Sequence, residues 1–186
     1  MKTGNINVQT ENIFPIIKKF LYSDHEIFLR ELVSNAVDAS QKLKFLSSNG
    51  EFKGELGDLQ VEVVLDEKNK TITIKDNGIG MTQDEIHKHI GTIAKSGTKE
   101  FVEKLEKAKE GWDHNLIGQF GVGFYSAFMV ASDLTVITRK AGEKKLWIWK
   151  SDGESNFTID ESDDLEQLSS NRGTKIILSY IYINNR

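Results

Sequence analysis

Three closely spaced glycines, Gly118, Gly121 and Gly123, lead directly into the apolar segment FYSAF at positions 124–128. Glycine allows the backbone to approach a ligand closely, and a helix N-terminus carries about half an elementary positive charge. The pattern therefore predicts the start of a helix that binds an anion such as phosphate. Its spacing, G-x-x-G-x-G, disfavours the dinucleotide-binding fold and the P-loop, which need other spacings. A tight turn between closely packed elements is the alternative interpretation.

A polar stripe on a predicted helix is the second candidate for chemistry. Glu31, Asn35 and Asp38 follow one another at i, i+4 and i+7, so they lie on one helix face. Such a stripe is usually just solvated, but Asn and Asp are poor helix formers and this stripe borders an apolar flank. Asn offers magnesium a neutral oxygen ligand, and Glu can orient a water molecule. The stripe thus favours a site for a magnesium phosphate.

The segment DNGIGM at positions 76–81 is the third candidate, because it follows a predicted strand directly. An ionised Asp76 can accept a hydrogen bond from an exocyclic amine, and Met81 can pack on the face of a heterocycle. The two glycines give a ligand access to the backbone. These features predict a pocket for an amino-substituted aromatic ring. An ordinary Asx turn is the alternative for an isolated DNG sequence.

The elements that must position these residues follow from hydrophobic periodicity. Ser23 with Glu26, and Thr82 with Glu85, have the spacing of capping boxes that open helices. Early helices followed by late antiparallel strands predict an α+β fold, a two-layer sandwich with helices on one face of a mostly antiparallel sheet. The expected helices begin near residues 10–12, 23, 82, 98 and 123, and the expected strands cover about 59–65, 72–74, 134–138, 146–148, 157–159 and 176–178.

Composition narrows the class of protein. The chain has 186 residues, of which 38% are hydrophobic, enough for one globular domain. A net charge of −4 argues against a nucleic-acid partner, and the lack of cysteine excludes disulfides and cysteine-based zinc sites. No apolar segment approaches the roughly 20 residues of a membrane span, and the segment MKTGNINVQT lacks a signal-peptide core. We therefore expect no membrane partner and a cytoplasmic location.

Taken together, the segments ELVSNAVDAS, DNGIGM, IGTIAKSGT and GQFGVGFYSAF resemble the N-terminal ATP-binding domain of the heat shock protein 90 family of molecular chaperones. The resemblance covers about residues 10–178 and is greatest to the bacterial members. Gyrase B, MutL and sensor histidine kinases share the same GHKL (Bergerat) ATPase fold. IGTIAKSGT and the long glycine motif are more specific to the chaperones than the other two segments are.

The resemblance implies a binding site for the base of ATP or ADP. Asp76 would accept a hydrogen bond from the adenine amino group, with Thr174 supporting it through water. Gly80 and Met81 would form the wall of the base pocket, and Asp38 would line it.

The resemblance also implies a site for the phosphates. Asn35 would coordinate Mg²⁺, Glu31 would act as the catalytic residue that orients or deprotonates the attacking water, and Phe124 would close the pocket near the sugar. Phe124 could instead be an aromatic residue of the hydrophobic core, and Lys95 could instead be a solvent-exposed lysine without a ligand. The phosphates would be held by Lys95 and by the backbone amides of Gly118, Gln119, Phe120, Gly121, Val122, Gly123 and Phe124.

By the same resemblance, residues 1–186 form one N-terminal ATP-binding domain with a mobile ATP lid at about 91–122, and the middle and dimerisation domains are absent from this chain. The full-length protein would be a homodimer that clamps on unfolded or partly folded client proteins, whereas the fragment would be a monomer and a very weak ATPase. Two alternatives stay open: another GHKL-type ATPase or kinase module, and a nucleotide-binding fragment without turnover.

Overall fold

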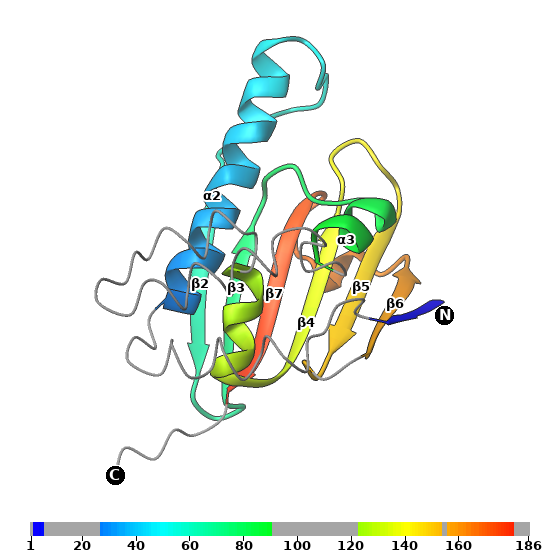
Figure 1. Cartoon of the computed structure of the whole chain (residues 1–186). Coiled ribbons are helices and arrows are strands. Elements are labelled where there is room, and N and C mark those ends of the chain that lie inside the picture. The colour runs from blue at the N-terminus through cyan, green and yellow to red at the C-terminus, as the bar shows by residue number, and fades with distance from the viewer. Residues whose placement is uncertain (1, 6–26, 91–122, 154–155, 181–186) are drawn as a thin grey trace, which may run out of the picture.

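The computed structural model describes residues 2–5, 27–90, 123–153 and 156–180 (Figure 1). In these segments the strands form a single sheet in the order β1-β6-β5-β4-β7-β3-β2, and every neighbouring pair is antiparallel. The predicted sheet is thereby confirmed. The strands are β1 (Lys2–Asn5), β2 (Val61–Asp66), β3 (Thr71–Asp76), β4 (Ala131–Arg139), β5 (Leu146–Ser151), β6 (Asn156–Ser162) and β7 (Gly173–Tyr180).

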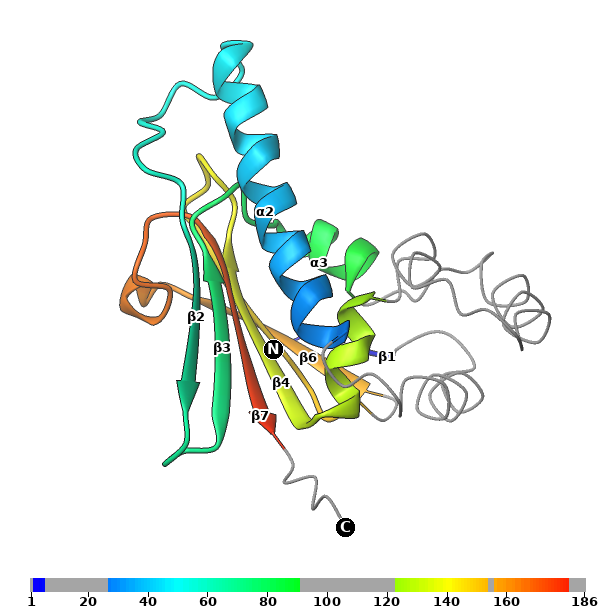
Figure 2. The same cartoon turned by 90° about the vertical axis from the view of Figure 1, so that its left-hand side faces the viewer.

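Helices α2 (Ile27–Ser48) and α3 (Gln83–His89) and the 3₁₀ helix η1 (Gly123–Met129) cover one face of this sheet (Figure 2). The two-layer α+β sandwich is therefore as predicted. A short 3₁₀ helix, η2 (Leu165–Gln167), follows β6. Among the described helices, none combines the length and the apolar character that a membrane crossing requires.

The predicted capping box at the start of α3 is present. The Thr82 hydroxyl accepts a hydrogen bond from Glu85 N, and the Glu85 carboxylate accepts one from Thr82 N at 2.8 Å. This reciprocal pair satisfies two backbone donors that a helix start otherwise leaves unpaired. The predicted Ser23–Glu26 box and the helices expected near residues 10–12 and 98 lie outside the described residues.

Two local expectations differ from the structure. The helix expected after the glycine motif is present, but it is a 3₁₀ helix rather than an α-helix. Six of its seven residues are buried, and the Ser126 hydroxyl donates to the carbonyl of Gly123, so packing and this short-range bond fix a tighter turn. Strand β1 was not predicted, because its sequence KTGN has no hydrophobic alternation; it joins the sheet at the β6 edge through backbone pairing.

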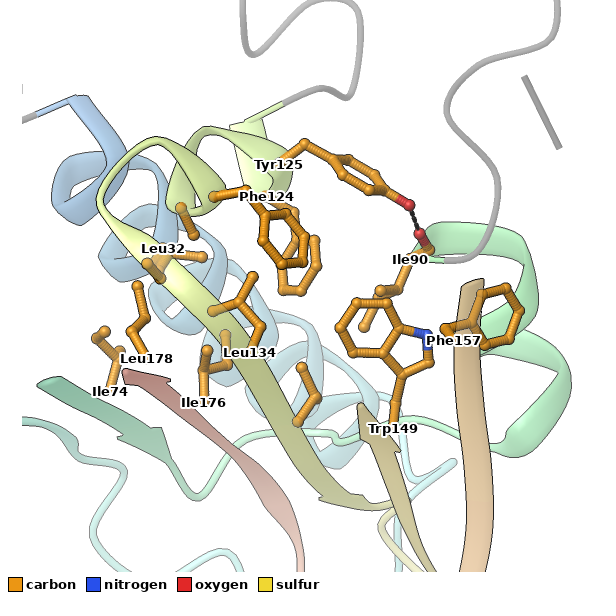
Figure 3. Packing of buried hydrophobic residues seen from close by; sticks show 14 of the residues in the cluster. Leu32, Ile74, Ile90, Phe124, Tyr125, Leu134, Trp149, Phe157, Ile176 and Leu178 are labelled. Atoms are coloured by element: carbon orange, nitrogen blue, oxygen red, sulfur yellow. Dashed lines mark hydrogen bonds between the residues drawn. The ribbon is translucent and has the colours of Figure 1, made fainter. Parts of the chain in front are cut away.

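Rows of apolar side chains cross the sheet beneath the helices. Ile74, Ile176 and Val136 are cross-strand neighbours on β3, β7 and β4, and Ile72, Leu178 and Leu134 form the next row. Leu32 from α2 and the aromatic rings of Phe124, Tyr125, Trp149 and Phe157 complete this core (Figure 3). The helix layer is thus packed on the sheet through a continuous apolar core.

Candidate functional site

A cavity of about 460 Å³ opens among α2, the segment after β3, the start of η1 and the sheet. The structure brings together in its lining nine of the residues that the sequence singled out: Glu31, Asn35, Asp38, Asp76, Gly80, Met81, Gly123, Phe124 and Thr174. The others, Lys95, Gly118, Gln119, Phe120, Gly121 and Val122, lie outside the described residues. The three separate motifs therefore contribute to one site.

The floor of the cavity is apolar and ends in a polar row. Ile74, Ile176 and Val136 line it from the sheet. One step further along the strands, Asp76 on β3 is paired with Thr174 on β7, which is paired in turn with Thr138 on β4. Because side chains two residues apart share a face of a strand, this polar row lies on the same face as the apolar floor. A flat apolar group with a polar edge fits such a surface.

Asp76 carries the buried charge of the site. The residue is only 5% exposed, and its carboxylate accepts a hydrogen bond from Gly78 N at 2.9 Å. Burial raises the pKa of this carboxyl from 3.8 to about 6, although the backbone N–H groups of Gly78 and Thr174 act in the opposite direction. At neutral pH the Asp76 carboxylate is therefore ionised although its burial is unfavourable. A hydrogen-bond donor from a ligand would reduce this desolvation cost.

The loop after Asp76 is fixed against both neighbouring layers. Ile79 N donates to the Ala39 carbonyl of α2 at 3.1 Å, and Ala141 N donates to the Ile79 carbonyl at 2.8 Å. Gly80 has a φ of +63°, and a Cβ atom there would collide with the Arg139 carbonyl oxygen. Only glycine fits both the conformation and the space, and the close approach brings Met81 into the cavity wall.

Helix α2 supplies the polar stripe. Asn35 and Asp38 are exposed, whereas Glu31 is half-buried beside the first residue of η1. A Cβ atom at Gly123 would lie 2.5 Å from Oε2 of Glu31, so the missing side chain at 123 makes room for this carboxylate. The glycine motif and the helix stripe, which are separate signals in the sequence, meet at this contact.

Phe124 belongs both to the cavity wall and to the core. Its ring packs edge-on against Tyr125 and Trp149, each with a centroid distance of 5.6 Å. The core interpretation of this aromatic is thereby supported, and its predicted place near a sugar stays a prediction.

An ion pair at the cavity rim was not found from the sequence. Lys140 Nζ donates to Glu85 Oε1 at 2.6 Å, and both residues line the cavity. Burial raises the pKa of Glu85, but the hydrogen bonds from Lys140 and Thr82 outweigh it and hold that pKa below its ordinary value. The pair links α3 to the end of β4. The sequence predicted only the capping role of Glu85. It could not predict the ion pair, because Lys140 is distant along the chain.

The donors present suit a magnesium ion that is bound together with phosphates. The described residues contain no group of three or more His, Cys, Asp or Glu side chains that could hold a metal alone. Mg²⁺ commonly takes one or two protein oxygens and completes its shell with substrate phosphates and water. Asn35, exposed to the cavity beside Glu31, fits the role of such a single oxygen ligand.

Comparison with known proteins decides the family. The family model described as histidine kinase-, DNA gyrase B- and HSP90-like ATPase matches residues 22–174. The chain belongs to this family of ATPases. It is 56% identical over 179 residues to the chaperone protein HtpG of Bacteroides thetaiotaomicron, 53% identical over 178 residues to that of Porphyromonas gingivalis, and 49% identical over 178 residues to that of Pseudoalteromonas translucida.

These matches cover 95–96% of this chain but only 25–27% of the relatives, so the chain spans about a quarter of their length. The resemblance to heat shock protein 90 chaperones, and to the bacterial members in particular, is confirmed. Within the ATPase family the chain is therefore of the HtpG type rather than a gyrase B, MutL or histidine-kinase type.

Proposed function

We propose that this chain is the N-terminal ATP-binding and ATP-hydrolysing domain of an HtpG-type chaperone. The observation that carries the proposal is the row of Asp76 and Thr174 at the end of an apolar floor, inside a cavity that also contains Glu31 and Asn35. The floor accommodates a purine ring, and the buried carboxylate accepts a hydrogen bond from its exocyclic amine. Gly80 and Met81 form the wall beside the ring, and Asp38 lines the cavity.

The phosphates would extend from the base toward α2 and the start of η1. Asn35 would supply an oxygen to Mg²⁺, which neutralises the charge on the phosphate oxygens when it is bound. The backbone from Gly118 to Phe124 and Lys95 would hold the phosphates.

Glu31 would accept a hydrogen bond from the attacking water and align it with the terminal phosphorus. A P–O bond to the water oxygen forms while the bond to the ADP oxygen breaks, and the water proton passes to Glu31 or to the released phosphate. The contact of Glu31 with Gly123 supports this role, since it places the carboxylate where the glycine motif would hold the phosphates.

The remaining parts of the proposal concern the longer protein. Residues 1–186 would form one domain with the ATP lid at about 91–122, and nucleotide state would control clamping of a cytoplasmic homodimer on unfolded client proteins. The isolated domain would bind nucleotide as a monomer but hydrolyse ATP very slowly, because the arginine that stabilises the transferring phosphate is expected from a middle domain. The similarity to HtpG proteins supports this picture.

Titration calorimetry of the 186-residue chain with ADP and Mg²⁺ tests the proposed site. Micromolar binding, about −8 kcal/mol, is expected, and Asp76→Asn should abolish it. Asp163→Asn is the matched control, because Asp163 is exposed and is not part of the cavity lining. Failure of the unchanged chain to bind ADP, or equal loss in both variants, would refute the proposed function.

A further inference from the structure

The hydroxyl of Thr138 lies directly behind the polar row of the cavity. Thr138 is fully buried and is not part of the cavity lining. Its Oγ1 atom has three hydrogen-bond partners, each at 3.0 Å: Met81 N, the Gly173 carbonyl oxygen and Thr174 Oγ1. No residue predicted from the sequence has this position, and the nucleotide site described above does not use it.

The chemistry of these partners fixes which hydroxyl donates to which. A backbone N–H can only donate, so Thr138 accepts from Met81. A carbonyl oxygen can only accept, so the single hydroxyl proton of Thr138 goes to Gly173. In the contact with Thr174 Oγ1, the Thr138 hydroxyl therefore has only a lone pair to offer. All three contacts are satisfied together only if Thr174 donates its own proton to Thr138, which leaves only the acceptor lone pairs of Thr174 for the cavity.

From this arrangement we propose that Thr138 is a specificity-determining positioning residue, which makes Thr174 a hydrogen-bond acceptor toward the purine 6-position. The inference rests on the proposed nucleotide site. Thr174 is the cross-strand neighbour of Asp76, so the cavity presents two acceptors side by side. An amino group at the purine 6-position has two protons to donate, whereas a keto oxygen at that position meets two acceptors.

The test compares the affinity of ADP with that of IDP, which differs at the 6-position by carrying a keto oxygen. Thr138→Val removes the hydroxyl with little change in shape and leaves the Thr174 hydroxyl able to rotate and donate to the keto oxygen. The preference for ADP over IDP, measured by calorimetry as a ratio of Kd values, should fall about tenfold. Thr138→Ser restores the hydroxyl and should keep the preference of the unchanged chain.

Two controls separate positioning from a merely structural effect. Thr135→Val makes the same change on β4 but on the opposite face, where Thr135 is paired with Ile177, and should leave the ratio unchanged. In a Thr174→Val background, Thr138→Val should have no further effect on the ratio, because it acts through Thr174. An unchanged ratio in Thr138→Val, loss of the ratio in Thr138→Ser, or additive effects in the double variant would overturn the proposal.

A measurement on the unchanged chain decides the proposal even if Thr138→Val fails to fold. Buried hydroxyl protons can be detected by NMR, and a coupling across the hydrogen bond from the Thr138 proton to the Gly173 carbonyl carbon is expected. A Thr138 proton directed at Thr174 instead would overturn the proposal. If the unchanged chain bound no ADP while this coupling was present, the proposed function would fail and the arrangement of the hydroxyls would stand.

Discussion

Replacing Asp76 by Asn should make the empty domain more stable while abolishing nucleotide binding. Burial raises the pKa of this carboxyl from 3.8 to about 6. Because each pH unit corresponds to 1.36 kcal/mol, the ionised carboxylate lowers the stability of the fold by about 3 kcal/mol at neutral pH. An amide avoids the burial of charge and can still accept from Gly78 N, but its new N–H donors need partners. We therefore expect a net gain of about 1–3 kcal/mol.

The pH dependence of this gain has a definite sign. The pKa of Asp76 is higher in the folded chain than in the unfolded one, so its contribution to stability is fully present below about pH 3.8 and is lost as the pH rises through about 6. Asp76→Asn removes this dependence. Urea unfolding of the nucleotide-free chain should show the variant's advantage at about pH 7.5, and the advantage should disappear at about pH 4.

Binding should change in the opposite direction. The amide offers a donor to the adenine amine where the carboxylate offered an acceptor, so ADP affinity should fall by about 3 kcal/mol or more, at least roughly 150-fold, and no binding should remain at micromolar ADP. A variant that was destabilised to the same extent at every pH would refute the account of a costly buried charge. A variant that bound ADP with unchanged affinity would refute the assignment of Asp76 to the base.

The other predictions address the catalytic residue, the metal and the backbone of the site. Glu31→Ala in a full-length protein should bind ATP with near-native affinity but fail to hydrolyse it; equal loss of both in calorimetry and phosphate-release assays would remove Glu31 from its catalytic role. Asn35→Ala should weaken ATP binding mainly when Mg²⁺ is present, so equal losses with and without the metal would contradict its coordination. Gly80→Ala should destabilise the fold by about 3 kcal/mol or more in thermal unfolding. Gly142→Ala, which shares a positive φ but has open space around it, should cost only about 1–2 kcal/mol, and similar costs for both would show that the Arg139 contact is unimportant.

Local signals in the sequence predicted most of the fold. The period-two segments became strands β2 to β7. The apolar flank beside the polar stripe of the predicted helix, which includes Leu32, Ala36 and Leu43, became the buried face of α2. The capping box at Thr82 marked the start of α3 to the residue. These signals are local because they depend on the alternation of burial along a single element. Strand β1 lacks such alternation and was missed for that reason.

The candidate site was only partly predictable, because strand register and helix contacts are long-range properties. The alternation of Leu134, Val136 and Thr138 indicated that Thr138 faces the same side as the core residues. Nothing in the sequence placed it opposite Thr174, which is set by the pairing of β4 with β7. The contact between Glu31 and Gly123 likewise depends on how η1 packs against α2.

The two ends of the cavity are built differently, and this difference matters for the proposed function. At the base end, Asp76, Thr174 and Thr138 belong to three paired strands, whose hydrogen bonds fix their separation before any ligand arrives. At the phosphate end, the Glu31 carboxylate from α2 meets the residue that directly follows the proposed lid. ATP and ADP share the same base and differ only in the terminal phosphate. Under the proposed function, recognition of the base is common to both nucleotides, and a response to hydrolysis would begin where α2 meets η1.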